Sequence, residues 1–320
     1  MSEKRTSIER IASEETHIRL PDRGATEVLV VRNGDDYRGK AAQEAEALEY
    51  GGLEVGQLMP SSSELARLNI ESQLIEVLAG LTPRELSEVD IVIGASDSQL
   101  GGLATSDGSA PHPYQRCVDT ARAVLEGAQS VLESHGMHPD QLLNHRFQPS
   151  VERQSGSGPE PMVVKDIEDL KVVDRTEEYF GLLEEEAKAT GVNKWVLYER
   201  DDIPWLREVR ESWGIEGPSE IAGRMTRFLS RVRNVSDWYH RRNPGGDGQG
   251  RRLIAIVVAP QDLTGPFLNM AAGLGHEGNE IPRIQHLGGF NVSIKPDESP
   301  LEVAVGDSEF VVDVPNHRTQ

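Results

Sequence analysis

The 320-residue sequence has little cysteine and no long apolar run. Its single cysteine, Cys117, excludes a disulfide framework and a cysteine-rich zinc site within one chain. The absence of any uncharged apolar stretch of about 18 residues excludes a membrane-spanning helix. The start, MSEKRTSIER, is polar with no apolar run behind it, which is not the pattern of a secretory signal. We therefore expect a cytoplasmic protein without a membrane partner.

Basic residues are also few. Asp and Glu number 53 against 33 Lys and Arg, so the formal charge is −20. Because nucleic-acid phosphates attract basic surfaces, this acidic balance argues against a nucleic-acid partner. A local basic pocket is still compatible with it, since salt screens charges beyond about 8 Å. Hydrophobic residues make up 37% of the chain, which is enough apolar material for a packed core.

Three continuous apolar runs have the composition of buried strands. They occupy residues 27–31, 90–94 and 252–258. Such runs are typical of parallel strands that are covered on both faces. Weaker strand candidates lie at 161–165, 170–173, 290–295 and 301–312.

Helical patterns alternate with these strands. They predict helices over residues 61–80, 114–134, 176–190, 218–240 and 263–273. The first has apolar residues at helical spacing, namely Leu65, Leu68, Leu74, Ile75 and Leu78. The alternation predicts an α/β fold, a three-layer α/β/α sandwich with a mostly parallel sheet. In such sheets the ligand site lies at the carboxyl ends of the strands.

The chain organisation follows from composition. Residues 1–25 are predicted to be a polar N-terminal extension, and residues 26–315 a single domain. An enlarged insertion covers about residues 140–217 and begins with a linker-like stretch. Most of the aromatic residues lie in this insertion or in the helix after it. They are compatible with a cap over the pocket, an oligomer contact or a satellite core: Trp195, Tyr198, Trp205, Trp213, Trp238 and Tyr239.

Arg32 and Asn33 directly follow the first buried run. An arginine at a strand end is suited to gripping a phosphate or carboxylate with two hydrogen bonds. The same residues also fit a simple turn, because Asn33-Gly34 is a strong turn signal.

Arg116 stands in the first turn of the helix predicted after the second strand. A cation there opposes the helix dipole and costs some tenths of a kcal/mol. A helix N-terminus is also a favourable anion site, so an unfavourable cation at this place hints at ligand binding. The alternative is a solvated surface arginine.

These segments together resemble the histidine phosphatase superfamily, which has the phosphoglycerate-mutase-like fold. In that family the first strand ends in arginine-histidine-glycine, and here EVLVVRNGDD resembles it. A later arginine opens a helix with a threonine-alanine pair, as PYQRCVDTARAVL does. The last core strand ends in a small residue before histidine and glycine, and IAIVVAPQDL is similar to it. The resemblance covers roughly residues 26–295, with insertions.

The resemblance implies roles for particular residues. Arg32 and Arg116 match the family's phosphate-binding arginines. The segment RTEEYFGL resembles the mutase segment that carries the proton donor, which would be Glu177. The nucleophilic histidine position falls on Asn33, and the second histidine position falls on Pro260.

These two departures bear on the chemistry. The amide of Asn33 is not a useful nucleophile, because its nitrogen lone pair is delocalised. Pro260 has no donor for a developing phosphoryl charge; if the alignment slips by one, Gln261 offers an uncharged hydrogen bond. Loss of a nucleophile costs on the order of 10⁶-fold in turnover, roughly 8 kcal/mol of barrier. Two arginines that bind substrate and transition state equally do not restore the rate.

Three functions are therefore in competition. The first is a catalytically inactive, histidine-phosphatase-like protein that binds a small phosphate- or carboxylate-bearing ligand through Arg32 and Arg116. The second is an active phosphomonoesterase or mutase-like enzyme with a displaced nucleophile, for which His112 is the first candidate. His112 is also a candidate phosphate ligand, as is Gln261. The third is an interaction or scaffold protein with no ligand.

Other nucleophiles and metal ligands have weaker support. The alternatives to His112 are Asp35, Asp36, Cys117, His276 and His286, and for Cys117 a buried structural role is the better interpretation. A metal site would have to use His135, His138 and His145, whose spacing does not match common zinc sites. We predict no metal and no cofactor. A homo-oligomer is compatible with the sequence.

Overall fold

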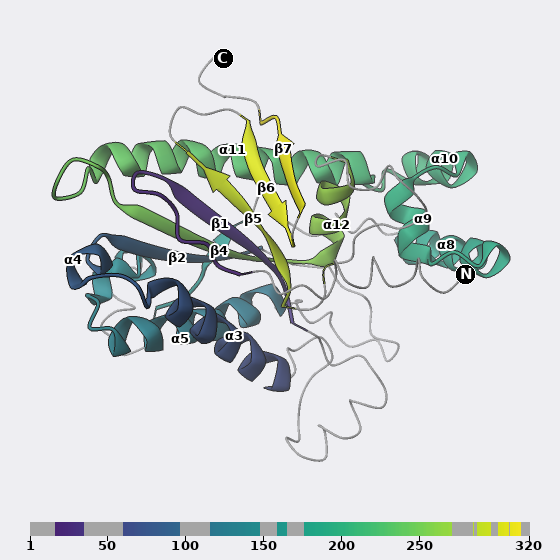
Figure 1. Cartoon of the computed structure of the whole chain (residues 1–320). Coiled ribbons are helices and arrows are strands. Elements are labelled where there is room, and N and C mark those ends of the chain that lie inside the picture. The colour runs from purple at the N-terminus through teal and green to yellow at the C-terminus, as the bar shows by residue number, and fades with distance from the viewer. Residues whose placement is uncertain are drawn as a thin grey trace.

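The computed structural model describes residues 17–34, 60–96, 116–147, 159–164, 176–270, 284, 287–295, 300–306 and 308–314. In this part of the chain one sheet has the strand order β3-β2-β4-β1-β5-β6-β7 (Figure 1). The strands are β1 (Thr26–Arg32), β2 (Val89–Ser96), β3 (Met162–Val164), β4 (Arg252–Ala259), β5 (Gly289–Ile294), β6 (Leu301–Val305) and β7 (Ser308–Val312).

The helices alternate with the first four strands. They are α3 (Pro60–Leu78), α4 (Pro83–Leu86), α5 (Arg116–Ser134), the 3-10 turn η1 (Pro139–Gln141), α6 (Asn144–Phe147), α8 (Thr176–Thr190), α9 (Lys194–Arg200), α10 (Pro204–Ser212), α11 (Pro218–Arg242) and α12 (Gln261–Met270). The predicted α/β fold class is confirmed. The short helices α9 and α10 were not predicted, because each is too short to show a clear helical period.

The sheet is mixed. Strands β3, β2, β4 and β1 are mutually parallel, whereas β5, β6 and β7 pair in antiparallel fashion beyond β1. The stretch 301–312, expected as one strand, is a hairpin of β6 and β7. Gly306 has a φ of 55° between them, a backbone conformation that glycine adopts readily and that reverses the chain.

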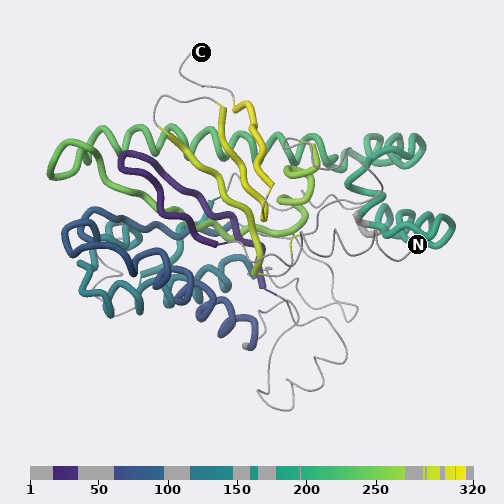
Figure 2. Tube along the Cα trace, in the orientation of Figure 1, coloured from purple at the N-terminus to yellow at the C-terminus, as the bar shows by residue number. Residues whose placement is uncertain are grey.

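Helices cover both faces of the sheet, as Figures 1 and 2 show. Along β1, Val28 and Val30 pack into the core beneath α11 and α12, while Leu29 and Val31 pack beneath α3 and α5. The continuous apolar runs are explained by this arrangement, because both sides of each central strand are buried.

Of the five apolar residues that predicted helix α3, only Leu74 and Leu78 are buried. Its buried residues recur every fourth position, at Ala66, Ile70, Leu74 and Leu78. By contrast Leu65, Leu68 and Ile75 are 58%, 46% and 47% exposed. The face that begins with Ala66 packs because α3 and α5 approach closely: a Cβ atom at Gly127 would lie 2.6 Å from the carbonyl oxygen of Arg67.

The insertion contributes to the main core. Helices α8, α9 and α10 lie beyond the carboxyl ends of the parallel strands, on the side of α12 (Figure 1). Tyr179 and Tyr198 from these helices are buried in the same cluster as the sheet residues. The idea of one aromatic satellite core is therefore wrong for Tyr198, and Trp205 and Trp238 are 43% and 51% exposed. The side chain of Trp195 lies outside the described residues.

Residues 17–25, from the predicted polar extension, pack against the domain. Ile18 is 2% exposed, and its N–H donates to Oε1 of Gln73 at 2.9 Å. Asn291 Nδ2 donates to the carbonyl of His17 at 2.9 Å. This segment thus joins α3 to β5. None of the helices in the described ranges has the length and apolar character needed to cross a membrane.

Candidate functional site

The site is centred on the carboxyl ends of two adjacent parallel strands. Arg32 of β1 is level with Ala259 of β4. The chain continues this pairing beyond β1, since the N–H of Asn33 donates to the carbonyl of Ala259 at 3.0 Å. Asn33 and Pro260, the two positions where the family resemblance places histidines, therefore follow strand ends that lie side by side.

Arg32 is half-buried at the end of β1. Its Nη1 donates to the carbonyl of Ile284. Its backbone pairs with the segment before β5: the Arg32 N–H donates to Gly288 at 2.7 Å, and Leu287 donates to the Arg32 carbonyl at 3.1 Å. Leu287 has a φ of 65°, a strained conformation for a residue with a side chain. The end of β1 is thus firmly held.

Asn33 is 2% exposed and forms a local turn. Its Nδ2 donates to the carbonyl of Gly34 at 2.8 Å. The N–H of Gly34 in turn donates to Oγ1 of Thr120 on α5 at 3.1 Å. The turn interpretation of Asn33-Gly34 is consistent with these bonds, and the same turn fastens the end of β1 to the first turns of α5.

Arg116 is the first residue of α5 and is half-buried. Thr120 follows four residues later, so the two side chains lie on one face of the helix. Because Thr120 contacts Gly34, Arg116 is on the face of α5 that meets the strand end. Cys117 is 1% exposed in the core beneath α3 and α5, as expected for a structural cysteine.

Pro260 and Gln261 connect β4 directly to α12. The Pro260 carbonyl accepts from Leu263 and Thr264, both at 3.2 Å, and so starts the helix. Gln261 is half-buried, and both polar atoms of its side chain, Nε2 and Oε1, are buried without a hydrogen-bond partner among the described residues. Unpaired buried amide groups are costly, so this position is unusual.

Glu199 is a polar residue near the site that sequence reasoning did not find. It lies on α9 and is 4% exposed. A Cβ atom at Gly265 would lie 2.7 Å from Glu199 Oε1 and 2.8 Å from Gln261 Nε2. The available signal was Gly265 itself, because a glycine inside a helix is unfavourable and points to a close approach.

Several sequence candidates lie outside the described residues, so their places are not given: Asp35, Asp36, His112, His276 and His286. Glu177 lies in the first turn of α8, and its side chain is likewise outside the described part. His135 Nδ1 lies 3.0 Å from the carbonyl of Val131, and His138 caps η1. No group of three metal-ligating side chains occurs among the residues that the structure describes.

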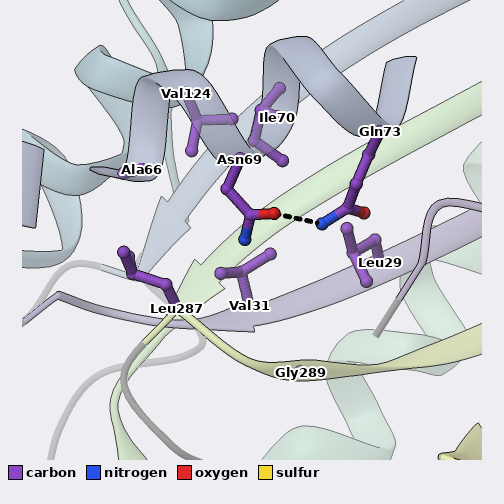
Figure 3. Close-up of a pocket in the computed structure, with 9 residues that line it drawn as sticks. All are labelled: Leu29, Val31, Ala66, Asn69, Ile70, Gln73, Val124, Leu287 and Gly289. Atoms are coloured by element: carbon purple, nitrogen blue, oxygen red, sulfur yellow. Dashed lines mark hydrogen bonds between the residues drawn. The ribbon is translucent and has the colours of Figure 1, made fainter. Parts of the chain in front are cut away.

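Among the described residues, Arg32 and Arg116 line neither of the following two cavities. One, of about 10 Å³, lies between α3, α5 and the ends of β1 and β5, where Asn69 Oδ1 accepts from Gln73 Nε2 at 2.9 Å (Figure 3). That is room for about one water molecule. The other, of about 810 Å³, is open and lies between α9, α10, the start of α11 and the end of α12. Its lining arginines are paired with carboxylates, as Arg210 is with Asp201 at 3.0 Å.

No protein-family model matches the chain, and no curated protein matches it. Among solved structures, a phosphoglycerate mutase from Bacillus anthracis str. Sterne is similar over 92% of this chain and 94% of its own, with 14% identity and a TM-score of 0.39. At that identity and TM-score the likeness carries no statement about the chemistry of the site.

Proposed function

We propose that the chain binds a small phosphate-bearing ligand through Arg32 and Arg116 and does not hydrolyse it through a histidine nucleophile. The observation that carries the proposal is the Gly34–Thr120 hydrogen bond of 3.1 Å. Because this bond fastens the start of α5 to the end of β1, it brings the elements that carry the two arginines to one edge of the sheet.

The local electrostatics support an anion at this edge. Helices α5 and α12 both begin there, at Arg116 and Gln261, and helix N-termini favour negative charge. Two guanidinium groups add positive charge in a chain whose formal charge is −20. A local cluster of positive charge in an acidic protein is therefore suited to a small anion rather than to a long polyanion.

The absence of a histidine nucleophile supports binding without turnover. Asn33 occupies the position after Arg32, and its amide nitrogen is engaged with the carbonyl of Gly34 at 2.8 Å. Pro260 has no side-chain donor. What remains is binding energy that does not distinguish the transition state from the substrate.

The first test is thermal melting with inorganic phosphate or vanadate. A ligand that binds only the folded state raises the melting temperature. We expect Arg32→Ala and Arg116→Ala each to abolish this rise. Arg122→Ala is the matched control, because Arg122 is on the same helix and pairs with Asp119 at 2.8 Å and Glu160 at 2.9 Å. An unchanged rise in both site variants would overturn the proposal.

A second measurement separates binding from catalysis. We expect purified protein to hydrolyse an aryl phosphate no faster than its Arg32→Ala variant does. Turnover that disappears with Arg32 would instead indicate an active phosphomonoesterase with a displaced nucleophile, and His112 would be the first residue to mutate. If the protein shows neither turnover nor stabilisation by phosphate, the third function, an interaction protein with no ligand, is favoured.

A further inference from the structure

Glu199 of α9 and Gln261 of α12 lie close together where these two helices pack. Both side chains converge on Gly265, at 2.7 Å and 2.8 Å from the place of a Cβ atom. Leu263, Phe267 and Leu268 of the same helix α12 are buried. Asn269 Nδ2 of α12 donates to the backbone carbonyl of Glu199 at 3.2 Å, which ties α9 to α12 at this place.

This pair lies on the same face of the sheet as the Arg32 side chain. Side chains alternate along a strand, so Arg32 follows Val28 and Val30 onto the face covered by α11 and α12. Arg32 is level with Ala259, which belongs to the same core cluster. Gln261 is two residues farther along, a span of at most about 7 Å.

The unpaired amide of Gln261 specifies what it binds. It offers donors at Nε2 and an acceptor at Oε1, both buried and without a partner among the described residues. A hydroxyl group both donates and accepts, so it matches this amide. An ammonium group donates only and would leave Nε2 unpaired.

The carboxylate of Glu199 restricts the ligand further. A hydroxyl beside Glu199 can donate to it, whereas a carboxylate or a second phosphate would meet a like charge at a buried site. Placing like charges together at an interface disfavours binding strongly.

We propose that Glu199 and Gln261 form a hydroxyl-binding subsite beside Arg32, and that the ligand is a phosphorylated polyol with no second acidic group. This inference rests on the proposed function, because Arg32 and Arg116 would hold the phosphate of the same ligand. It adds a residue, Glu199, that decides which phosphate esters bind.

Two ligands that differ at one carbon test the subsite by calorimetric titration. Glycerol 3-phosphate carries a hydroxymethyl group where 3-phosphoglycerate carries a carboxylate. We expect the wild-type protein to bind glycerol 3-phosphate at least about tenfold more tightly. Glu199→Gln keeps the shape and removes the charge, so it should bring the ratio of the two dissociation constants close to one. Glu208→Gln, at an exposed site on α10, should leave the ratio unchanged.

The outcomes distinguish the hydroxyl subsite from the phosphate site on which it depends. Equal or tighter binding of 3-phosphoglycerate by the wild type, or an unchanged ratio in Glu199→Gln, would overturn the hydroxyl subsite. Phosphate binding that depends on Arg32 would then still stand. If neither ester nor inorganic phosphate binds the wild type, the anion site fails and the subsite fails with it.

Discussion

Buried polar groups differ between the side of the sheet where the parallel strands begin, here called the amino edge, and the side where they end, the carboxyl edge. At the amino edge Asp90 is 1% exposed and fully engaged: Arg251 donates to it at 2.6 Å and 2.7 Å, and Tyr239 donates its hydroxyl. At the carboxyl edge the amide of Gln261 is buried without a partner among the described residues, and Leu287 has a strained backbone. A satisfied network stabilises a fold, whereas unsatisfied or strained groups at a strand end are typical of binding sites. The Asp90 network at the amino edge therefore stabilises the fold, and the carboxyl edge is where we propose that a ligand binds.

Removing the buried carboxylate at the amino edge should have the largest effect on the stability of the fold. Asp90→Ala leaves the charge of Arg251 without its partner, so we expect about 3–5 kcal/mol of lost unfolding free energy. Chemical denaturation measures this loss. As a control, Lys295→Ala removes an exposed pair with Glu302 and should cost at most about 1 kcal/mol. A loss of similar size in both variants would remove the distinction between buried and exposed pairs.

A substitution at the carboxyl edge should raise the free energy of unfolding instead of lowering it. Gln261→Leu replaces an unpaired buried amide with an apolar group of similar size. We expect the free energy of unfolding to rise by about 1 kcal/mol, because the cost of the unpaired amide disappears. Phosphate-ester binding should weaken in the same variant. Gln129→Leu on α5 is the control: its half-buried amide donates to Glu133 at 3.1 Å, so this substitution should not raise the free energy of unfolding. A destabilised Gln261→Leu would show that the amide supports the fold.

The smallest expected effect is a pH dependence at the amino edge. Burial lowers the pKa of His240, whose Nε2 lies 3.0 Å from Oγ1 of Thr26. The unfolded chain therefore takes up a proton at this histidine before the folded protein does. Stability from this group is complete above the usual histidine pKa and is lost as the pH falls below it. Between pH 7.5 and 5.5 the melting temperature of wild type should fall more than that of His240→Gln. Equal falls would assign the pH dependence to other groups.

The sequence was informative where burial is symmetrical. The runs at 27–31, 90–94 and 252–258 lie within β1, β2 and β4, because central strands covered on both faces need apolar side chains at every position. The sequence was less informative where close packing between two helices decides which face of a helix is buried. In α3 the apolar residues Leu65 and Ile75 point outward, since the close approach at Gly127 favours the face with Ala66.

The candidate site was predictable only in part. Arg32 and Arg116 were accessible because strand ends and helix starts are visible in a sequence. Glu199 was not, because its neighbours Gln261 and Gly265 are more than sixty residues away along the chain and contact it only through the docking of α9 on α12. A lone glutamate in a short helix has no local pattern that separates it from a solvated one.

The position of β1 in the sheet has a consequence for the order of folding. Its two neighbours are β4 and β5, so Thr26 pairs with Leu253 and with Ile294. During synthesis the apolar segment TEVLVV therefore has no strand partner until more than two hundred further residues have been added. Contacts this distant in sequence form slowly, and an unpaired apolar strand is prone to aggregation. The nascent chain should consequently depend on chaperones that shield its first strand until β4 emerges.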